Sequence, residues 1–322
     1  MIPPEFSGLE RLARTAGAVP VAVEILPGDV GRRRYLRLTL SEGASVLGVF
    51  YPPEESDSRR RWVAARSALR ERLRVPGLLA DDGEGNHLVE DFGKSDLAAR
   101  LRSMPHERAD WLSRASSAAA ILAAMPDPGI NRPFDAAFFR RELELAREAV
   151  FDMFLEEPLS PEDRVSHDAW ADALCAEVAG HPAALCHRDY HGNNLFPLGD
   201  GVGWIDFQDL RPGPDTYDLA SLLWERTTLD WMTPELADSV IESYARARGT
   251  APAAFRSRFD RVLLQRAWKV CGTFARAVAQ GKGEVYRRYL PGELALVSRL
   301  LSDGAHDRAF RRVFEARLAA LC

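Results

Sequence analysis

Apolar and polar residues alternate with a period of two in the first part of the chain. Over residues 35–40, leucines at every second position are separated by Arg37 and Thr39. Because successive side chains of a strand point to opposite faces, this pattern predicts a strand with one face in the core. The runs 21–26 and 45–51 are similarly apolar and short. We therefore expect several short strands at this end of the chain.

Helical spacing dominates farther along the chain. An arginine-rich helix is predicted over 58–73, followed by a strand-like segment over 87–93. Apolar residues three and four positions apart then predict further helices. Their ranges are 96–101, 109–125, 138–155, 216–225, 234–248, 252–279 and 291–301.

This change in pattern predicts two lobes. We place a short hinge at 88–93, which divides the chain into a small β-rich lobe over 1–92 and a large, mainly helical lobe over 93–322. The length of 322 residues supports this division, since single hydrophobic cores stop growing beyond about 250–300 residues. The predicted fold class is α+β.

The composition is typical of a globular protein. Hydrophobic residues make up 46% of the chain and charged residues 28%, and no apolar run reaches the roughly 18 residues of a membrane-spanning helix. The first residues lack the basic and apolar segments of a secretory signal, so we expect a cytoplasmic protein with no membrane partner. The net charge of −5 and the scattered basic residues argue against nucleic acid as a partner. The four cysteines are widely spaced, and we expect buried thiols rather than zinc ligands or disulfides.

The strongest chemical signal is the segment 187–194, H-R-D-Y-H-G-N-N. Asp189 precedes Asn194 by five positions, in an H-R-D-x-x-x-x-N arrangement. In phosphoryl transfer, such a loop directs the carboxylate to the acceptor hydroxyl and the carboxamide oxygen to a metal ion. Apolar residues on both sides indicate a buried loop rather than a surface turn. We predict a catalytic role for Asp189 and a metal-binding role for Asn194.

A second acidic cluster, I-D-F-Q-D, follows at 205–209. Asp206 ends an apolar segment, and the interval after Asn194 has room for one β-hairpin, so both side chains can reach one Mg²⁺. We predict Asp206 as the second metal ligand. Gln208 and Asp209 are candidates for substrate contact, and for Asp209 contact with the metal or a turn-capping role are the alternatives.

The motif G-P-D-T-Y-D-L-A at 213–220 is typical of a loop that leads into a helix. Asp218 lies on the apolar first turn of this helix. We predict that it has a structural role, in which its carboxylate accepts hydrogen bonds from backbone amides of the catalytic loop.

These motifs resemble the aminoglycoside phosphotransferase and choline kinase superfamily, which has a protein-kinase-like fold. Over nearly its whole length the chain is similar to the bacterial anomeric kinases of N-acetylmuramate and N-acetylglucosamine. The segments that carry this similarity include R-R-Y-L-R, L-V-E-D-F-G, H-R-D-Y-H, D-F-Q-D and, nearer the C-terminus, L-Q-R-A-W-K-V and F-A-R.

The resemblance implies that ATP donates its γ-phosphate to the C1 hydroxyl of an amino sugar, as in the recycling of cell-wall sugars. It also implies site residues. Asp189 would be the base, Asn194 and Asp206 would bind magnesium, and the backbone of Val89, Glu90 and Asp91 would bind adenine.

One departure from the protein-kinase pattern is that no lysine precedes Lys94. Protein kinases use a lysine on the third strand to contact the α- and β-phosphates. Arg33, Arg34 or Arg37 are candidates for this contact, because guanidinium groups bind phosphate in a bidentate manner. The alternative is that they are solvated arginines on a half-exposed strand. A glycine-containing turn at 27–31 would supply flexible backbone over the phosphates.

The sugar site is predicted on the helix over 252–279. Gln265, Lys269 and Arg276 share one face of this otherwise apolar helix. They would present a cationic face to the N-acetyl group or the lactyl carboxylate of the sugar. The alternative is an internal ion pair with Asp260 or another carboxylate, since buried polar groups need partners.

His191, next to the predicted base, is a further candidate for sugar contact, although a lone histidine is more often structural. Three hypotheses remain open at this stage. The first is a monomeric sugar 1-kinase that uses ATP and Mg²⁺, and the second is a kinase of another small hydroxylated molecule, such as another sugar, an aminoglycoside or a choline-like compound. The third is a nucleotide-binding pseudokinase, which the missing lysine favours and the intact acidic motifs oppose.

Overall fold

The computed structural model describes residues 2–26, 32–281, 283–318 and 321. It divides into two compact units, and each is described by itself. Unit 1 contains residues 1–103 and 192–210, and unit 2 contains residues 104–191 and 211–322. The predicted hinge therefore lies inside unit 1, which also includes the segment after the catalytic loop. The assignment of nucleotide binding to 1–92 and of catalysis to 93–322 stays a prediction.

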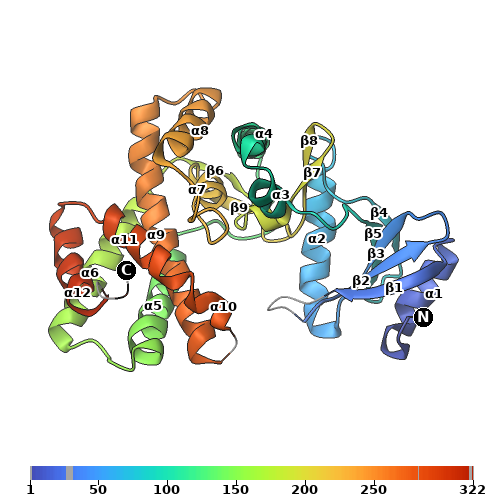
Figure 1. The fold of residues 1–322 in the computed structure, drawn as a ribbon, viewed down its shortest axis with the longest axis horizontal. Coiled ribbons are helices and arrows are strands. Elements are labelled where there is room, and N and C mark those ends of the chain that lie inside the picture. Colours follow the sequence, from blue (N-terminus) through green and yellow to red (C-terminus); the bar gives the residue numbers. More distant parts are fainter. Residues whose placement is uncertain (1, 27–31, 282, 319–320, 322) are drawn as a thin grey trace. The chain divides into compact units, whose positions relative to one another are not determined.

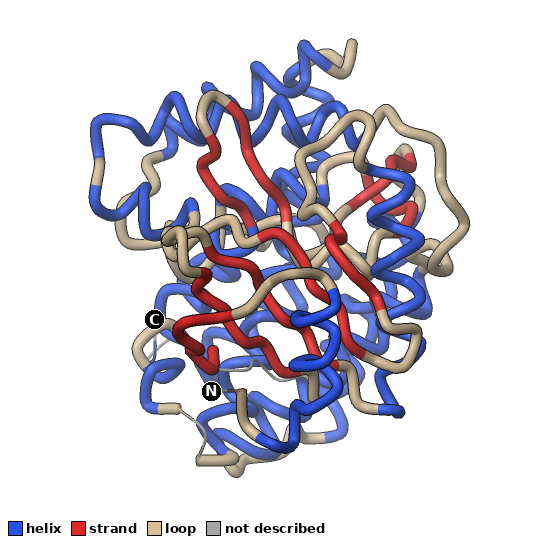
Figure 2. Tube along the Cα trace, turned by 90° about the vertical axis from the view of Figure 1, so that its right-hand side faces the viewer, coloured by secondary structure: helices blue, strands red, loops and turns tan. Residues whose placement is uncertain are grey.

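Unit 1 is built around a five-stranded antiparallel sheet with the strand order β1-β2-β3-β5-β4 (Figures 1 and 2). The strands are β1 (Pro20–Leu26), β2 (Arg34–Leu40), β3 (Ser45–Phe50), β4 (Leu78–Asp81) and β5 (Asn86–Glu90). The predicted strands over 21–26, 35–40 and 45–51 are confirmed to within one residue at each end. The predicted turn at 27–31 lies outside the described residues.

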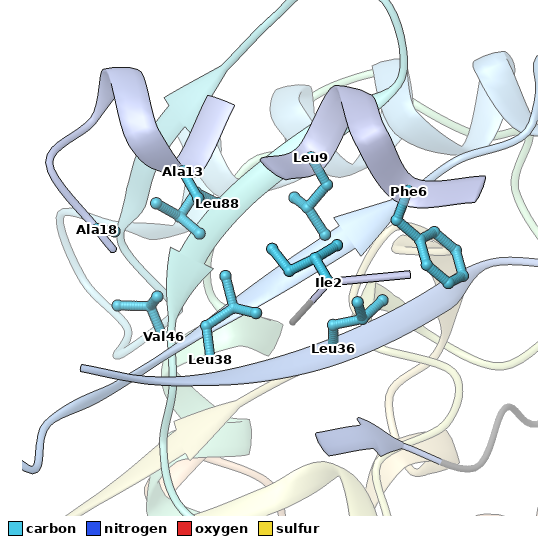
Figure 3. Packing of buried hydrophobic residues seen from close by; sticks show 9 residues of the cluster. All are labelled: Ile2, Phe6, Leu9, Ala13, Ala18, Leu36, Leu38, Val46 and Leu88. Atoms are coloured by element: carbon cyan, nitrogen blue, oxygen red, sulfur yellow. The ribbon is translucent and has the colours of Figure 1, made fainter. Parts of the chain in front are cut away.

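The alternation along β2 separates a core face from a cavity face. Leu36 and Leu38 pack with Val46 and Leu88 beneath helix α1 (Ser7–Thr15), which contributes Leu9 (Figure 3). Each large aliphatic side chain buried in this way contributes about 1.5–3 kcal/mol. Tyr35 and Arg37, which alternate with these leucines on β2, line a cavity on the other side of the sheet. The period-two pattern therefore fixes which side chains can reach a ligand.

Two helices and a hairpin complete unit 1. Helix α2 (Ser56–Leu69) begins after a pair of prolines, and helix α3 (Leu97–Ser103) follows the sheet. Strands β7 (Leu195–Leu198) and β8 (Gly201–Trp204) form an antiparallel hairpin. This is the hairpin predicted between Asn194 and Asp206, and it is confirmed.

Unit 2 is mainly helical (Figure 1). Its elements are α4 (Arg108–Ala123), α5 (Ala136–Arg147), a π-helix (Glu148–Phe154), α6 (Pro161–Ala179), α7 (Tyr217–Leu223), α8 (Pro234–Ala247), α9 (Pro252–Ala279), α10 (Glu284–Arg287), α11 (Leu290–Leu300), α12 (Ala305–Leu318) and the paired strands β6 (Ala183–Cys186) and β9 (Arg211–Pro214). Its core contains Trp170, Trp268 and Phe310 from three helices, and the Trp170 and Phe310 rings stack with centroids 4.0 Å apart. Three of the cysteines are buried free thiols in this unit, as predicted, and Cys322 lies outside the described residues.

Candidate active site

The loop of unit 2 that contains Asp189 follows β6 and is held by a buried carboxylate. Asp218, on the first turn of α7, accepts hydrogen bonds from the backbone N–H of His187 at 2.6 Å and of Arg188 at 3.0 Å. Arg188 has a φ of 81°, a conformation that is rare outside glycine. The two amides are fixed immediately before Asp189. The predicted structural role of Asp218 is confirmed.

Arg266 of α9 supports the same loop from the other side. Its guanidinium donates to Ser221 Oγ at 2.7 Å and to the carbonyl oxygen of Arg188 at 3.3 Å. It also lies 4.5 Å from the centroid of the Tyr217 ring. Arg266 was not among the predicted site residues. The sequence could have indicated Arg266, because it is an arginine inside an otherwise apolar helix. A guanidinium that is buried in this way needs hydrogen-bond partners, which points to a supporting role.

Charged neighbours keep Asp189 ionised. Partial burial alone would raise the pKa of this carboxyl group, but Lys269, Arg188 and Arg266 outweigh it and lower the pKa to about 2. Burial lowers the pKa of His191, so its ring is neutral at neutral pH. The loop therefore holds an ionised carboxylate beside a neutral imidazole, which suits proton abstraction from a hydroxyl group.

Unit 1 contains a cavity of about 450 Å³ on the second face of its sheet. Its wall includes both the sheet and the segment around the hairpin. The lining residues that matter for the site are Arg33, Tyr35, Arg37, Tyr51, Val89, Glu90, Asp91, Asn194, Asp206 and Gln208. Six of the seven predicted nucleotide and metal residues thus share one cavity, namely Arg33, Val89, Glu90, Asp91, Asn194 and Asp206.

The predicted hinge residues Val89, Glu90 and Asp91 line this cavity, and protein groups hold the two carboxylates. Arg74 pairs with Glu90, whose carboxylate also accepts from the Gly77 amide at 3.1 Å. Arg37 Nε donates to Asp91 at 2.6 Å. The arrangement agrees with the prediction that the backbone of 89–91 contacts a nucleotide base.

The two predicted metal ligands are close along the hairpin. The backbone N–H of Ile205 donates to the carbonyl oxygen of Asn194 at 3.0 Å. Asn194 lies immediately before β7 and Ile205 immediately before Asp206, so this bond brings the two predicted ligands together at the base of the hairpin. Asp206 has a φ of 61° and accepts from Gln208 at 2.9 Å and from Arg33 at 3.1 Å. A carboxylate and a carboxamide oxygen on one cavity wall are ligands that suit Mg²⁺. The guanidinium at Asp206 shows that the position accommodates a cation.

The three candidate arginines for phosphate contact differ in position. Arg34 is exposed and donates to the carbonyl oxygens of Arg32 and Arg33, and the cavity lining does not include it. Arg37 lines the cavity but is committed to Asp91. Arg33 lines the cavity with 18% of its side chain exposed. Geometry therefore favours Arg33.

The predicted sugar-binding face of α9 contacts helix α5. Gln265 donates to Glu142 at 3.0 Å, and Lys269 Nζ lies 3.9 Å from the same carboxylate. Arg276 donates to the carbonyl oxygen of Leu145 at 3.1 Å. Gln265 and Lys269 thus follow the internal-pair alternative, with Glu142 as the partner, whereas Asp260 pairs with Arg256.

The remaining predicted site residues lie in different units. Gln208 is buried beside Asp206 in unit 1, and Asp209 is half-buried in the turn that follows. Asp189 and His191 belong to unit 2, whereas Asn194 and Asp206 belong to unit 1. That the base and the metal ligands meet around one ion stays a prediction.

Two curated relatives match most of the chain. The N-acetylmuramate/N-acetylglucosamine kinase of Neisseria meningitidis serogroup B is 29% identical over 284 residues, which cover 84% of this chain and 83% of that protein. The enzyme of the same name from Pseudomonas aeruginosa is 28% identical over 269 residues, which cover 81% of this chain and 78% of that protein.

A solved structure confirms the predicted fold. The ADP-bound aminoglycoside phosphotransferase APH(2'')-Ib has a TM-score of 0.63 with this chain at 13% sequence identity, and the match covers 96% of this chain and 99% of that one. Within the part of the chain that the structure describes, every helix is too short or too polar to cross a bilayer. Residues 22–258 match the model of the phosphotransferase enzyme family. With this match over most of its length, the chain belongs to the phosphotransferase enzyme family.

Proposed function

We propose that the chain is an ATP-dependent kinase that transfers the γ-phosphate to the anomeric hydroxyl of an amino sugar, N-acetylmuramate, N-acetylglucosamine or both. The observation that carries this proposal is the similarity to two kinases of these sugars over more than four fifths of the chain. Asp189 is ionised, and Asp218 fixes its loop by accepting a hydrogen bond from the His187 amide, which supports a catalytic rather than a pseudokinase role. The reaction would serve the recycling of cell-wall sugars.

Asp189 is the proposed base. Its carboxylate accepts the proton of the C1 hydroxyl while the hydroxyl oxygen forms a bond to the γ-phosphorus. The bond between that phosphorus and the β,γ-bridging oxygen breaks, and ADP leaves with the electron pair. Because the pKa of Asp189 is lowered to about 2, the group is a carboxylate at neutral pH, which is the form that can take the proton as the hydroxyl oxygen bonds to phosphorus.

Asn194 and Asp206 are the proposed magnesium ligands. A bound Mg²⁺ would neutralise charge on the phosphate oxygens. Both residues line one cavity, and Gln208 orients the Asp206 carboxylate through a hydrogen bond of 2.9 Å. Val89, Glu90 and Asp91 provide backbone contacts to the adenine of ATP, and Arg33 contacts the phosphates.

The sugar contacts belong to the proposal as well. His191 stands next to the base and offers a neutral ring to a sugar hydroxyl. Gln208 and Asp209 extend the polar surface beyond Asp206. Lys269 and Gln265 act through Glu142, whose remaining acceptor capacity suits hydroxyl groups, and Arg276 is the outermost candidate. We further propose that the enzyme acts as a cytoplasmic monomer.

³¹P NMR of the product tests the proposal. The purified protein is incubated with ATP, Mg²⁺ and either sugar, and we expect a doublet from an anomeric phosphate together with release of ADP. Asp189→Asn should lower kcat about 10²–10⁴-fold while ATP binding is retained. ADP release with only other hydroxylated acceptors would reassign the substrate. ATP binding without turnover of any acceptor would instead identify a pseudokinase.

A further inference from the structure

Two protein groups hold the same oxygen of Asp206. Arg33 Nη2 and Gln208 Nε2 both donate to Oδ1, at 3.1 and 2.9 Å. Among the described residues, no hydrogen bond to Oδ2 is found. The carboxylate therefore has one oxygen held by the protein and one open to a ligand. Its backbone, at a φ of 61°, is in a conformation that the surrounding structure must maintain.

Arg33 is the cation of the cavity wall that can change partners. The described lining contains two arginines and no lysine. Arg37 has a bidentate contact with Asp91 and donates to the carbonyl oxygen of Gly93 at 2.8 Å, so it is fixed. Arg33 has an ion pair with the partly exposed carboxylate of Asp206, a further interaction with the Tyr51 side chain, and a position just before the first residue of β2. One ion pair at the start of a strand is easier to exchange than the bidentate pair and carbonyl contact that hold Arg37 within the sheet.

We propose that Arg33 makes metal binding at Asp206 conditional on the nucleotide. With no nucleotide bound, its guanidinium occupies the carboxylate and repels a bare divalent ion. The phosphates of a nucleotide attract the guanidinium and compensate its charge, which leaves Asp206 to the ion that arrives with them. This inference rests on the proposed function, because it assumes that the cavity binds a nucleotide together with a metal ion.

The physical basis is competition between cations for one anion. A guanidinium and a divalent ion at the same carboxylate repel one another, and partial burial reduces solvent screening of that repulsion. A nucleotide triphosphate supplies several acceptor oxygens that match the planar guanidinium. Arg33 therefore weakens the binding of metal alone and strengthens the binding of nucleotide, so its removal should change the two affinities in opposite directions.

Two binding measurements on the whole protein test this inference. Mn²⁺, a paramagnetic ion that takes oxygen ligands, is titrated without nucleotide and followed by electron paramagnetic resonance of the free ion. ATP is titrated without metal by calorimetry. For Arg33→Gln we expect Mn²⁺ affinity to rise about 10-fold and ATP affinity to fall about 10-fold. Arg33→Lys keeps the charge and should stay within about threefold of the wild type for Mn²⁺.

Arg34→Gln is the matched control. It removes the same charge at the neighbouring position, where the arginine side chain donates to backbone carbonyl oxygens and not to Asp206. It should leave Mn²⁺ affinity unchanged. Equal Mn²⁺ affinities for the wild type and Arg33→Gln, or an equal rise in both Gln variants, would overturn the inference. A wild-type protein that binds neither ATP nor Mn²⁺ in the presence of ATP would instead contradict the proposed function. Thermal melting of each variant verifies that it is folded.

Discussion

Asp218 accepts a hydrogen bond of 2.6 Å from the backbone amide of His187, 31 positions earlier in the chain. The same carboxylate accepts from the next amide, so one buried side chain fixes two consecutive peptide groups before Asp189. Burial raises the pKa of Asp218, and the His187 side chain and the two amides oppose this rise. The loop geometry thus depends on a buried acidic group whose carboxylate faces the backbone amides of the loop.

Asp218→Ala should reduce kcat by at least 10-fold and leave the Michaelis constant for ATP within about threefold. The variant loses two charge-assisted hydrogen bonds, which corresponds to about 3 kcal/mol of stability. Asp215→Ala is the matched control, because Asp215 is equally buried but pairs with Arg258 at 2.7 Å. Both variants should melt at lower temperature, but only Asp218→Ala should lose activity at a temperature where both are folded. Equal kcat values would contradict the role given to Asp218.

Strongly periodic segments of the sequence predicted the fold well. The helix predicted over 252–279 coincides with α9, and the strand over 35–40 differs from β2 by one residue. The helix predicted over 138–155 is an α-helix only as far as Arg147 and continues as a π-helix. Periodicity cannot distinguish the two, because a π-helix shifts the side-chain pattern by a single residue.

Helices α1, α6, α10 and α12 were absent from the sequence prediction. Pro161 occupies the first position of α6, where a proline is favourable. Ser160 accepts from the Asp163 amide and caps this helix, which is a signal that the sequence does carry. Strand β9 contains two prolines, so only its pairing with β6 identifies it.

In the candidate site, a contact could be predicted from the sequence where recognisable motifs contain both partners. The Asp218 contact is such a case, because its helix and the loop before Asp189 form a recognisable pair of motifs. The contact between Arg33 and Asp206 joins residues 173 positions apart, and the bond of Gln265 to Glu142 joins residues 123 positions apart. No spacing rule specifies such pairs, because tertiary packing selects the partner of a long side chain.

Lys269 should control the pH at which Asp189 becomes protonated. It is the strongest of the cations that lower the pKa of this carboxyl group against the effect of burial. Lys269→Met removes a positive charge that stabilises the carboxylate, so the pKa must rise. The acidic limb of the kcat/KM profile should therefore move to higher pH, by about one unit or more.

Arg276→Met removes a cation from the same helix, at a position where the side chain contacts the carbonyl oxygen of Leu145. The acidic limb of the kcat/KM profile of Arg276→Met should coincide with that of the wild type. If the acidic limb moves equally in both variants, the overall positive charge of the helix, and not Lys269 in particular, sets the pKa of Asp189.

Gly272 of α9 should be intolerant of a side chain. A Cβ atom there would lie 2.3 Å from the Cα atom of Ala146, on helix α5. Backbone cannot move aside as a flexible side chain would, so Gly272→Ala should lower the free energy of unfolding by about 1–3 kcal/mol. In contrast, Gly292 of α11 would place its Cβ 3.5 Å from Leu229, an ordinary contact.

Gly292→Ala should therefore raise the free energy of unfolding, by up to about 1 kcal/mol, because alanine favours the helix. Urea denaturation of both variants measures the two changes. If the two substitutions change stability in the same direction, the close packing of α9 on α5 is not the cause.

Glu293 should make the protein less stable as the pH rises. Its side chain is 1% exposed, and burial, with a further contribution from Glu225 that Arg266 partly offsets, raises its pKa to about 8. Between the unfolded pKa of about 4.5 and this value, the unfolded chain loses the proton and the folded protein keeps it. The folded state then binds more protons, so its stability falls across this range and levels off above pH 8.

Glu293→Gln keeps the shape of the protonated side chain and cannot ionise. The melting temperature of the variant relative to the wild type should therefore increase from pH 5 to pH 8, whereas at pH 4 the two proteins should differ little. Glu315→Gln on the exposed face of α12 is the control, and its difference from the wild type should not vary with pH in this way. A constant difference for Glu293→Gln would mean that the folded protein ionises this residue as readily as the unfolded chain does.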